Sequence, residues 1–285
     1  MRTVILLLGF SLPLYHTVRF AQHSDLYSHI LLIPFVSLYL GWISRDRFPR
    51  EDTPPPHAWA ALPLTAGVGL LLWAGLLFLS DRVVSQDLLA LSMYSLALLI
   101  GGLACLSLGR ATLRLLAFPL GFLVFLAPFP VFAERELETF LQNGSSVVAF
   151  GLFKLAGTPV FNDGNFFRLP GFSLEVAPEC SGIHSTVALF ITSLVAGQLL
   201  LRTPWKRGVL ALVVLPIALL RNGVRVVVIG ELCVHIGPEM IDSYIHRRGG
   251  PIFFALSLVP FLLILYFLLK SDRLGHPKSP PASLS

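Results

Sequence analysis

Residues 208–231 read GVLALVVLPIALLRNGVRVVVIGE, an apolar run interrupted only by the polar residues Arg221, Asn222 and Arg225 before it ends at Glu231. A run of this length is what an α-helix needs to cross about 30 Å of hydrocarbon. An arginine inside such a segment costs ~2.5–3.5 kcal/mol on insertion scales, so it usually has a functional partner. The alternative is an arginine without a function, near the helix end, whose long side chain reaches water at the membrane surface. This explanation fits Arg225 poorly, because apolar residues flank it on both sides. We therefore expect a membrane helix with Arg225 as its functional residue and Arg221 on the same face in support.

The rest of the chain has the composition of a membrane protein. Of its 285 residues, 55% are hydrophobic and 13% are charged, whereas soluble domains carry about 25% charged residues. The mean hydropathy is +0.76. The sequence predicts an all-α polytopic bundle of about eight transmembrane helices, with spans at residues 4–20, 29–44, 58–79, 88–108, 112–132, 182–201, 208–231 and 250–270.

These spans are interpreted as one integral-membrane domain over residues 1–270. The basic and apolar N-terminus could be a signal peptide, but no small-x-small cleavage pattern follows it, so an uncleaved first span is preferred. The fifth span contains Pro119, Pro128 and Pro130 and is expected to kink or end early. Residues 271–285 contain several prolines and predict a disordered tail.

The net charge of +5 is explained by topology. Nucleic-acid binding is disfavoured because the basic residues lie in short loops between the spans. The loops after the second, fourth, sixth and last spans carry this charge, which the positive-inside rule assigns to the cytoplasm. Both termini then lie inside, and we expect a bacterial inner-membrane protein. The basic residues are Arg45, Arg47, Arg50, Arg110, Arg114, Arg202, Lys206, Arg207, Lys270, Arg273 and Lys278.

The longest outward loop, residues 133–181, is expected to form a short extracytoplasmic insertion. Residues 134–156 have apolar positions at helical spacing and predict one or two amphipathic helices, broken at Asn143-Gly144. Residues 160–176 predict a hairpin with its turn at residues 161–165. The hairpin leads the chain to Cys180.

Cys180 is the candidate nucleophile. It stands where the hairpin meets the sixth span, and the positive end of a helix dipole favours a thiolate there. Ser181 and Gly182 let a backbone approach closely, and free N–H groups there could hold an oxyanion. The alternative is a buried inert thiol, the interpretation given to Cys105 and Cys233. The sequence has no metal-ligand or disulfide spacing, so no metal and no cofactor is expected.

His246 is the candidate acid and base. It precedes the last span and, by the topology above, shares the outward face with Cys180 and the outer half of the seventh span. A histidine so placed can exchange protons with a cysteine nucleophile and a leaving group. His184, one helical turn after Cys180, and His235, at the outer end of the seventh span, are alternatives for this role.

Taken in order, these residues resemble the exosortase/archaeosortase family of membrane transpeptidases. The similarity rests on Glu179-Cys180-Ser181-Gly182-Ile183, on Asn222-Gly223-Val224-Arg225, and on His246 before Gly249. Earlier stretches fit as well, at residues 27–34, 39–42, 155–160 and 174–177. Each motif alone is weak, but the ordered set over residues 25–265 is specific. One departure is Glu179, where a small residue is expected as often, and its carboxylate should raise the pKa of the neighbouring thiol.

The resemblance implies a Cys-Arg-His site of Cys180, Arg225 and His246 that faces the periplasm. It also implies a thiol protease or transpeptidase acting through an acyl-enzyme thioester. The implied partners are membrane-anchored proteins with a PEP-CTERM-type tail: a Pro-Glu-Pro-like motif, an apolar span and a basic end. Two rival functions are a membrane transporter or assembly partner in exopolysaccharide export, with Arg221 and Arg225 as the binding pair, and an acyltransferase acting on lipid.

Overall fold

The computed structural model describes residues 2–50, 52–53, 57–81, 84–176, 181–237, 239–240 and 249–275. The chain divides into two compact units, Met1–Glu134 and Arg135–Ser285. Among the described residues, five helical segments are long and apolar enough to cross a membrane, and a bent pair of helices provides a sixth candidate. The protein is therefore an all-α polytopic membrane protein with a small sheet, while the predicted number of eight spans is not confirmed.

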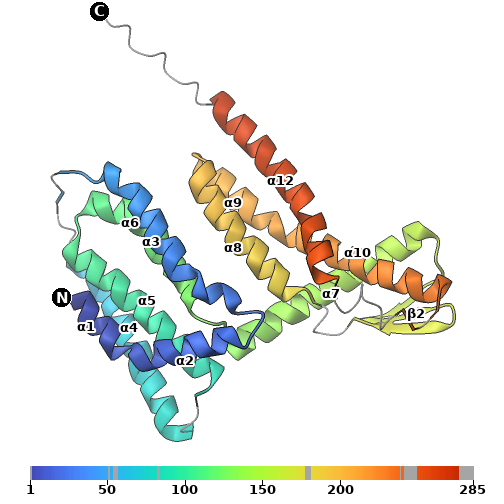
Figure 1. Cartoon of the computed structure of the whole chain (residues 1–285), viewed down its shortest axis with the longest axis horizontal. Coiled ribbons are helices and arrows are strands. Elements are labelled where there is room, and N and C mark those ends of the chain that lie inside the picture. Colours follow the sequence, from blue (N-terminus) through green and yellow to red (C-terminus); the bar gives the residue numbers. More distant parts are fainter. Residues whose placement is uncertain are drawn as a thin grey trace, which may run out of the picture. The chain divides into compact units, whose positions relative to one another are not determined.

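The first unit is built around two long antiparallel helices, α4 (Ala58–Asp81) and α5 (Gln86–Ser107). They approach closely because Gly67 and Gly102 leave no room for a side chain against the opposite helix, as is usual where helices pack in membranes. The hydroxyl of Ser95 also donates to the carbonyl of Gly67 at 2.7 Å. Around this pair lie α1 (Arg2–Gly9), α2 (Ser11–Gln22), η1 (Ser28–Leu31), α3 (Ile33–Ser44), η2 (Arg45–Arg47), α6 (Arg110–Phe122) and η3 (Leu123–Leu126) (Figure 1).

Three of the predicted spans differ from the observed helices. The first is divided between α1 and α2, and the second is shortened to α3 of 12 residues, about 18 Å long. The fifth ends early as expected: α6 passes into the short η3, which ends at Leu126, before Pro128 and Pro130. Hydropathy located the apolar runs of the sequence correctly. The helices are shorter than these runs because turns and 3₁₀ segments interrupt them.

Hydrogen bonds show which loops of the first unit share an end. The carboxylate of Asp52, in the loop after η2, accepts from the backbone N–H groups of Ala111 and Thr112 at 3.1 and 2.8 Å and so caps α6. Two predicted cytoplasmic loops therefore meet. At the loops predicted to face outward, the hydroxyl of Tyr27 donates to the carboxylate of Glu134 at 2.7 Å, and the side-chain amide of Gln86 donates to both the Tyr27 hydroxyl and the Glu134 carboxylate. Alternate loops of this unit lie together, as the charge pattern predicted.

The second unit contains α8 (Ile183–Leu200), α9 (Pro204–Leu212), α10 (Val214–His235) and α12 (Gly250–Gly275). Their shared core includes Leu189, Leu210, Val214 and Phe261. Near the end of α12, Asp272 accepts from the backbone N–H of Arg202 at 2.7 Å, just beyond the end of α8. Helices α8 and α12 therefore run in the same direction and begin at the same end of this bundle, which Figure 1 shows.

The same unit corrects two predictions. Helix α7 runs from Val131 to Ala156 without a break at Asn143-Gly144. Helix α12 continues to Gly275, beyond residue 270, where the disordered tail was expected to begin. Residues 276–285 lie outside the described part of the chain.

The predicted hairpin is a three-stranded antiparallel sheet of β1 (Phe161–Asp163), β2 (Phe166–Leu169) and β3 (Phe172–Glu175). Residues 161–163, predicted as a turn, form the extra strand, because the turn needs only Gly164 and Asn165. Alternate side chains of the sheet face inward against α7 and α10, with Phe167, Leu169 and Leu174 buried beside Phe153 and Val226. This packing places the sheet against the part of α10 that carries Arg225.

Candidate active site

The polar face of α10 is largely buried within the second unit. Arg221 is 6% exposed and Asn222 is 2% exposed, while Arg225 is half-buried one helical turn further on. Glycine makes this position possible: a Cβ on Gly223 would lie 2.6 Å from Cγ1 of Val148 in α7. The polar residues are thus held by close contact between α7 and α10, an arrangement that requires a residue without a side chain.

Arg225 lines a small cavity of about 20 Å³, with Glu175 at the end of β3, Val176 just after it, and Asn222 from its own helix. Val176 is 1% exposed and its backbone is fixed on both sides. Its N–H donates to the carbonyl of Asn165 at 2.9 Å, and its carbonyl accepts from the side-chain amide of Gln142. The chain four residues before Cys180 is therefore anchored beside Arg225.

Arg221 contacts the chain on the other flank of Cys180. Its Nη2 donates to the carbonyl of Gly182 at 3.1 Å and lies 3.4 Å from Oγ1 of Thr186. Gly182 is the N-cap residue of α8 and is left-handed, with φ of +73°. A Cβ there would lie 2.6 Å from Nη2 of Arg221 and 3.3 Å from Oδ1 of Asn222, so only glycine fits.

Ser181 is buried, 2% exposed, and its hydroxyl has no hydrogen-bond partner among the described residues. Nη1 of Arg221 is also buried and has no hydrogen-bond partner among the described residues. A buried donor without a partner costs about 1–3 kcal/mol. Two such donors adjoining Gly182 are consistent with a site that binds further oxygen atoms.

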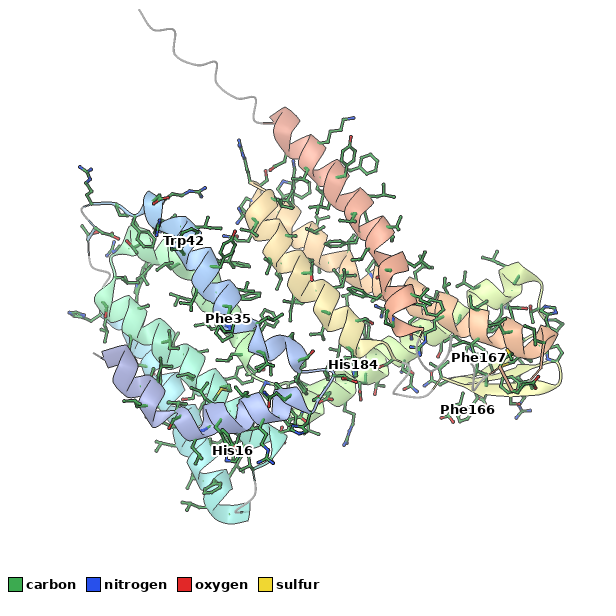
Figure 2. All side chains as sticks on the ribbon, viewed as in Figure 1. His16, Phe35, Trp42, Phe166, Phe167 and His184 are labelled. Carbon is green, nitrogen blue, oxygen red and sulfur yellow. The ribbon has the colours of Figure 1, made fainter. Side chains whose placement is uncertain are left out.

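The structure describes two of the three candidate histidines, His184 and His235. His184 is exposed in the first turn of α8 (Figure 2) and keeps its role as an alternative to His246. Nε2 of His235 lies 3.1 Å from the carboxylate of Glu231, and the imidazole is 73% exposed. His235 is ten residues beyond Arg225 on α10, about 15 Å along the axis, so it lies away from the site.

Cys180 and His246, predicted as nucleophile and acid/base, lie outside the described residues, as do the flanking residues 177–179 and 241–245. The structure thus brings together Arg221, Asn222 and Gly182 by direct contact, and Arg225 with Asn222 at one cavity. The contacts of Val176 and Glu175 with this face were not predicted. Their only sequence signal was the alternation of apolar residues in β3, which shows that a strand is buried but not which helix covers it.

Among the described residues, no group of three or more His, Cys, Asp or Glu side chains is placed to hold a metal ion. Of the two other thiols, both interpreted from the sequence as buried, Cys233 is buried and Cys105 is half-buried.

The family described as transmembrane exosortase matches residues 21–263 of this chain. No curated protein and no solved structure shows a significant match. The matched range begins before the second predicted span, ends within the last one, and includes every candidate site residue.

Proposed function

Because the chain belongs to the transmembrane exosortase family, a family of membrane cysteine transpeptidases, we propose that it cuts C-terminal sorting signals from exported proteins. In this proposal Cys180 is the nucleophile, Arg225 stabilises the developing negative charge and His246 transfers protons. The substrates are membrane-anchored proteins with a PEP-CTERM-type tail. The site faces the periplasmic side of a bacterial inner membrane.

One observation carries the proposal: the polar face of α10 contacts the chain on both flanks of Cys180. Val176 lines a cavity with Arg225, and Gly182 bonds Arg221. Only the five residues 177–181 separate these two anchors. Because the chain is anchored to α10 on both sides of this segment, we propose that Cys180 lies near the guanidinium groups of Arg221 and Arg225.

The direction of the helices supports His246 as the third member. Helices α8 and α12 begin at the same end of their bundle, because Asp272 at the far end of α12 binds the chain just after α8. Cys180 stands three residues before α8 and His246 stands four residues before α12. Both therefore precede helices that begin at the same end of the bundle.

In the proposed reaction the Cys180 thiolate attacks the scissile carbonyl carbon, forming a C–S bond and a tetrahedral oxyanion. Arg225 lies in a largely apolar setting, where attraction to that oxyanion is stronger than in water. When the oxyanion collapses, the C–N bond breaks and His246 gives its proton to the leaving amine. An amine or water then attacks the thioester carbon, and His246 takes the proton that this nucleophile loses. The C–S bond breaks and Cys180 leaves as a thiolate.

The test is processing of a tailed substrate in membranes that contain the full chain. Cys180→Ala should abolish processing and Arg225→Lys should not restore it fully, because lysine lacks the planar fork of arginine. Cys105→Ala, in α5 of the other unit, is the control and should leave processing unchanged.

Trapping of a thioester on Cys180 distinguishes the rival functions. A labelled tail peptide should be trapped, whereas a labelled lipid would be trapped by an acyltransferase. Processing that persists in Cys180→Ala would show that the nucleophile is assigned wrongly. Full biological function in that variant, lost only on changing Arg221 and Arg225, would favour a transporter or assembly partner.

A further inference from the structure

We infer that Arg221 is a positioning residue that holds the nucleophile loop against α10 through the carbonyl of Gly182. The inference rests on the proposed function, because it assumes that Cys180 reacts. It gives the two arginines different tasks: Arg225 faces the reacting atoms, and Arg221 fixes the backbone two residues after the thiol.

The first support is the number of donors at one oxygen. The carbonyl of Gly182 accepts from the N–H of Thr186 at 3.0 Å, from the hydroxyls of Ser185 and Thr186 at 3.1 and 2.8 Å, and from Nη2 of Arg221 at 3.1 Å. The three donors from α8 complete the first turn of that helix. Arg221 is the only one of the four donors that reaches the oxygen from another helix, so it ties the start of α8 to α10.

The second support is steric. Gly182 is left-handed and its Cα faces the guanidinium so closely that a Cβ would lie 2.6 Å from Nη2 of Arg221. Arg221 is itself 6% exposed, so it has little freedom to retreat. The position of Gly182 is therefore defined by contact with Arg221 as well as by the hydrogen bond.

The third support is spacing along α10. Arg221 and Arg225 are four residues apart and lie on one face of the helix, with about 6 Å of rise between them. When the loop that carries Cys180 is bound to Arg221 through Gly182, its distance from Arg225 is fixed by the geometry of the helix. Misplacement by about 1 Å can cost roughly 100-fold in rate, which is the effect expected when this tie is cut.

The chain offers a matched control at the opposite end of α8. Nε of Arg207 donates to the carbonyl of Leu201 at 2.9 Å, so it also ties a terminal carbonyl of α8 to a neighbouring helix. Arg207→Ala removes this bond, together with the one from Nη1 to Oε1 of Gln198, at the opposite end of α8 from Gly182. It should affect folding as Arg221→Ala does, but not the site.

The experiment measures tail processing and the alkylation of Cys180 by a maleimide across pH, in the full chain carrying Cys105→Ala and Cys233→Ala. Arg221→Ala should lower kcat about 100-fold with little change in KM, and should shift the pH profile of alkylation. Arg221→Lys should recover part of kcat and part of the wild-type pH profile of alkylation, because the lysine ammonium can donate one hydrogen bond to the carbonyl of Gly182. Arg207→Ala should leave the profile and kcat unchanged.

A double-mutant cycle tests the contact itself. Gly182→Ala should be harmful in the wild-type background, but less so in Arg221→Ala, because the clash with Nη2 is then absent and only the backbone strain is left. Strictly additive effects on kcat would overturn the inference, as would a profile for Arg221→Ala identical to that of Arg207→Ala. Alkylation does not require catalysis, so failure of the positioning role is distinguishable from failure of Cys180 as the nucleophile.

Discussion

Gly223→Ala is a direct test of the packing that holds the site. The added Cβ would lie 2.6 Å from Cγ1 and 3.0 Å from Cβ of Val148, and 3.2 Å from the backbone nitrogen of Ala149. Carbon atoms prefer a separation of about 3.5–4.0 Å, so α7 and α10 must separate by about 1 Å. The backbone atom in this contact prevents relief by rotation of one side chain.

The expected cost has two parts. Overpacking of a tight contact destabilises by about 1–3 kcal/mol, while replacing glycine by alanine in a helix interior returns about 1 kcal/mol. We therefore expect a net loss of up to about 2 kcal/mol in unfolding free energy. The separation also moves Asn222 and Arg225 relative to the sheet, so processing should fall by roughly 100-fold.

Gly151→Ala is the matched control, because Gly151 lies within α7 and its Cβ would meet nothing within 4 Å. The assays are thermal unfolding in detergent and tail processing in membranes. Gly151→Ala should equal or exceed the wild type in stability and retain full processing. If Gly223→Ala behaves like Gly151→Ala in both assays, the close contact of α7 and α10 does not position the site.

Two further predictions concern buried polar contacts. Asp272→Ala should destabilise strongly, because it leaves the ammonium of Lys206, 3.2 Å from the carboxylate and 8% exposed, buried without its counter-ion. Asp46→Ala, in an ion pair whose side chains are 56% and 87% exposed, should be almost silent in the same thermal unfolding assay; equal midpoints for the two variants would contradict this. Tyr27→Phe removes the hydrogen bond to Glu134 and should cost about 1.5–3 kcal/mol. Burial and the Glu134 carboxylate raise the pKa of the Tyr27 hydroxyl, so its contribution is complete below about pH 10, the value in the unfolded chain, and declines above it. Unfolding at alkaline pH should show a steeper loss for the wild type than for Tyr27→Phe, and parallel curves would refute this role.

The sequence by itself determined the class of the protein and the identity of its candidate residues. Long apolar runs have few ways to satisfy their backbone in lipid other than as helices, so residues 58–79 and 88–108 were found almost to the residue. Arg225 was evident for the same reason, since a charge inside an apolar run is costly and conspicuous. Loop charge predicted which loops lie together, and hydrogen bonds within each unit agree.

Only the tertiary structure decided what each polar residue contacts. Hydropathy could not show that residues 161–163 form a strand, because that strand depends on pairing with β2. It also could not show that α7 passes through Asn143-Gly144 unbroken, where Gly144 packs closely against Leu219 of α10. It also ranked Arg221 below Arg225 without giving it a task. That task depends on the carbonyl of Gly182, 39 residues away in the chain, and contacts over such separations follow from helix packing rather than from the order of residues.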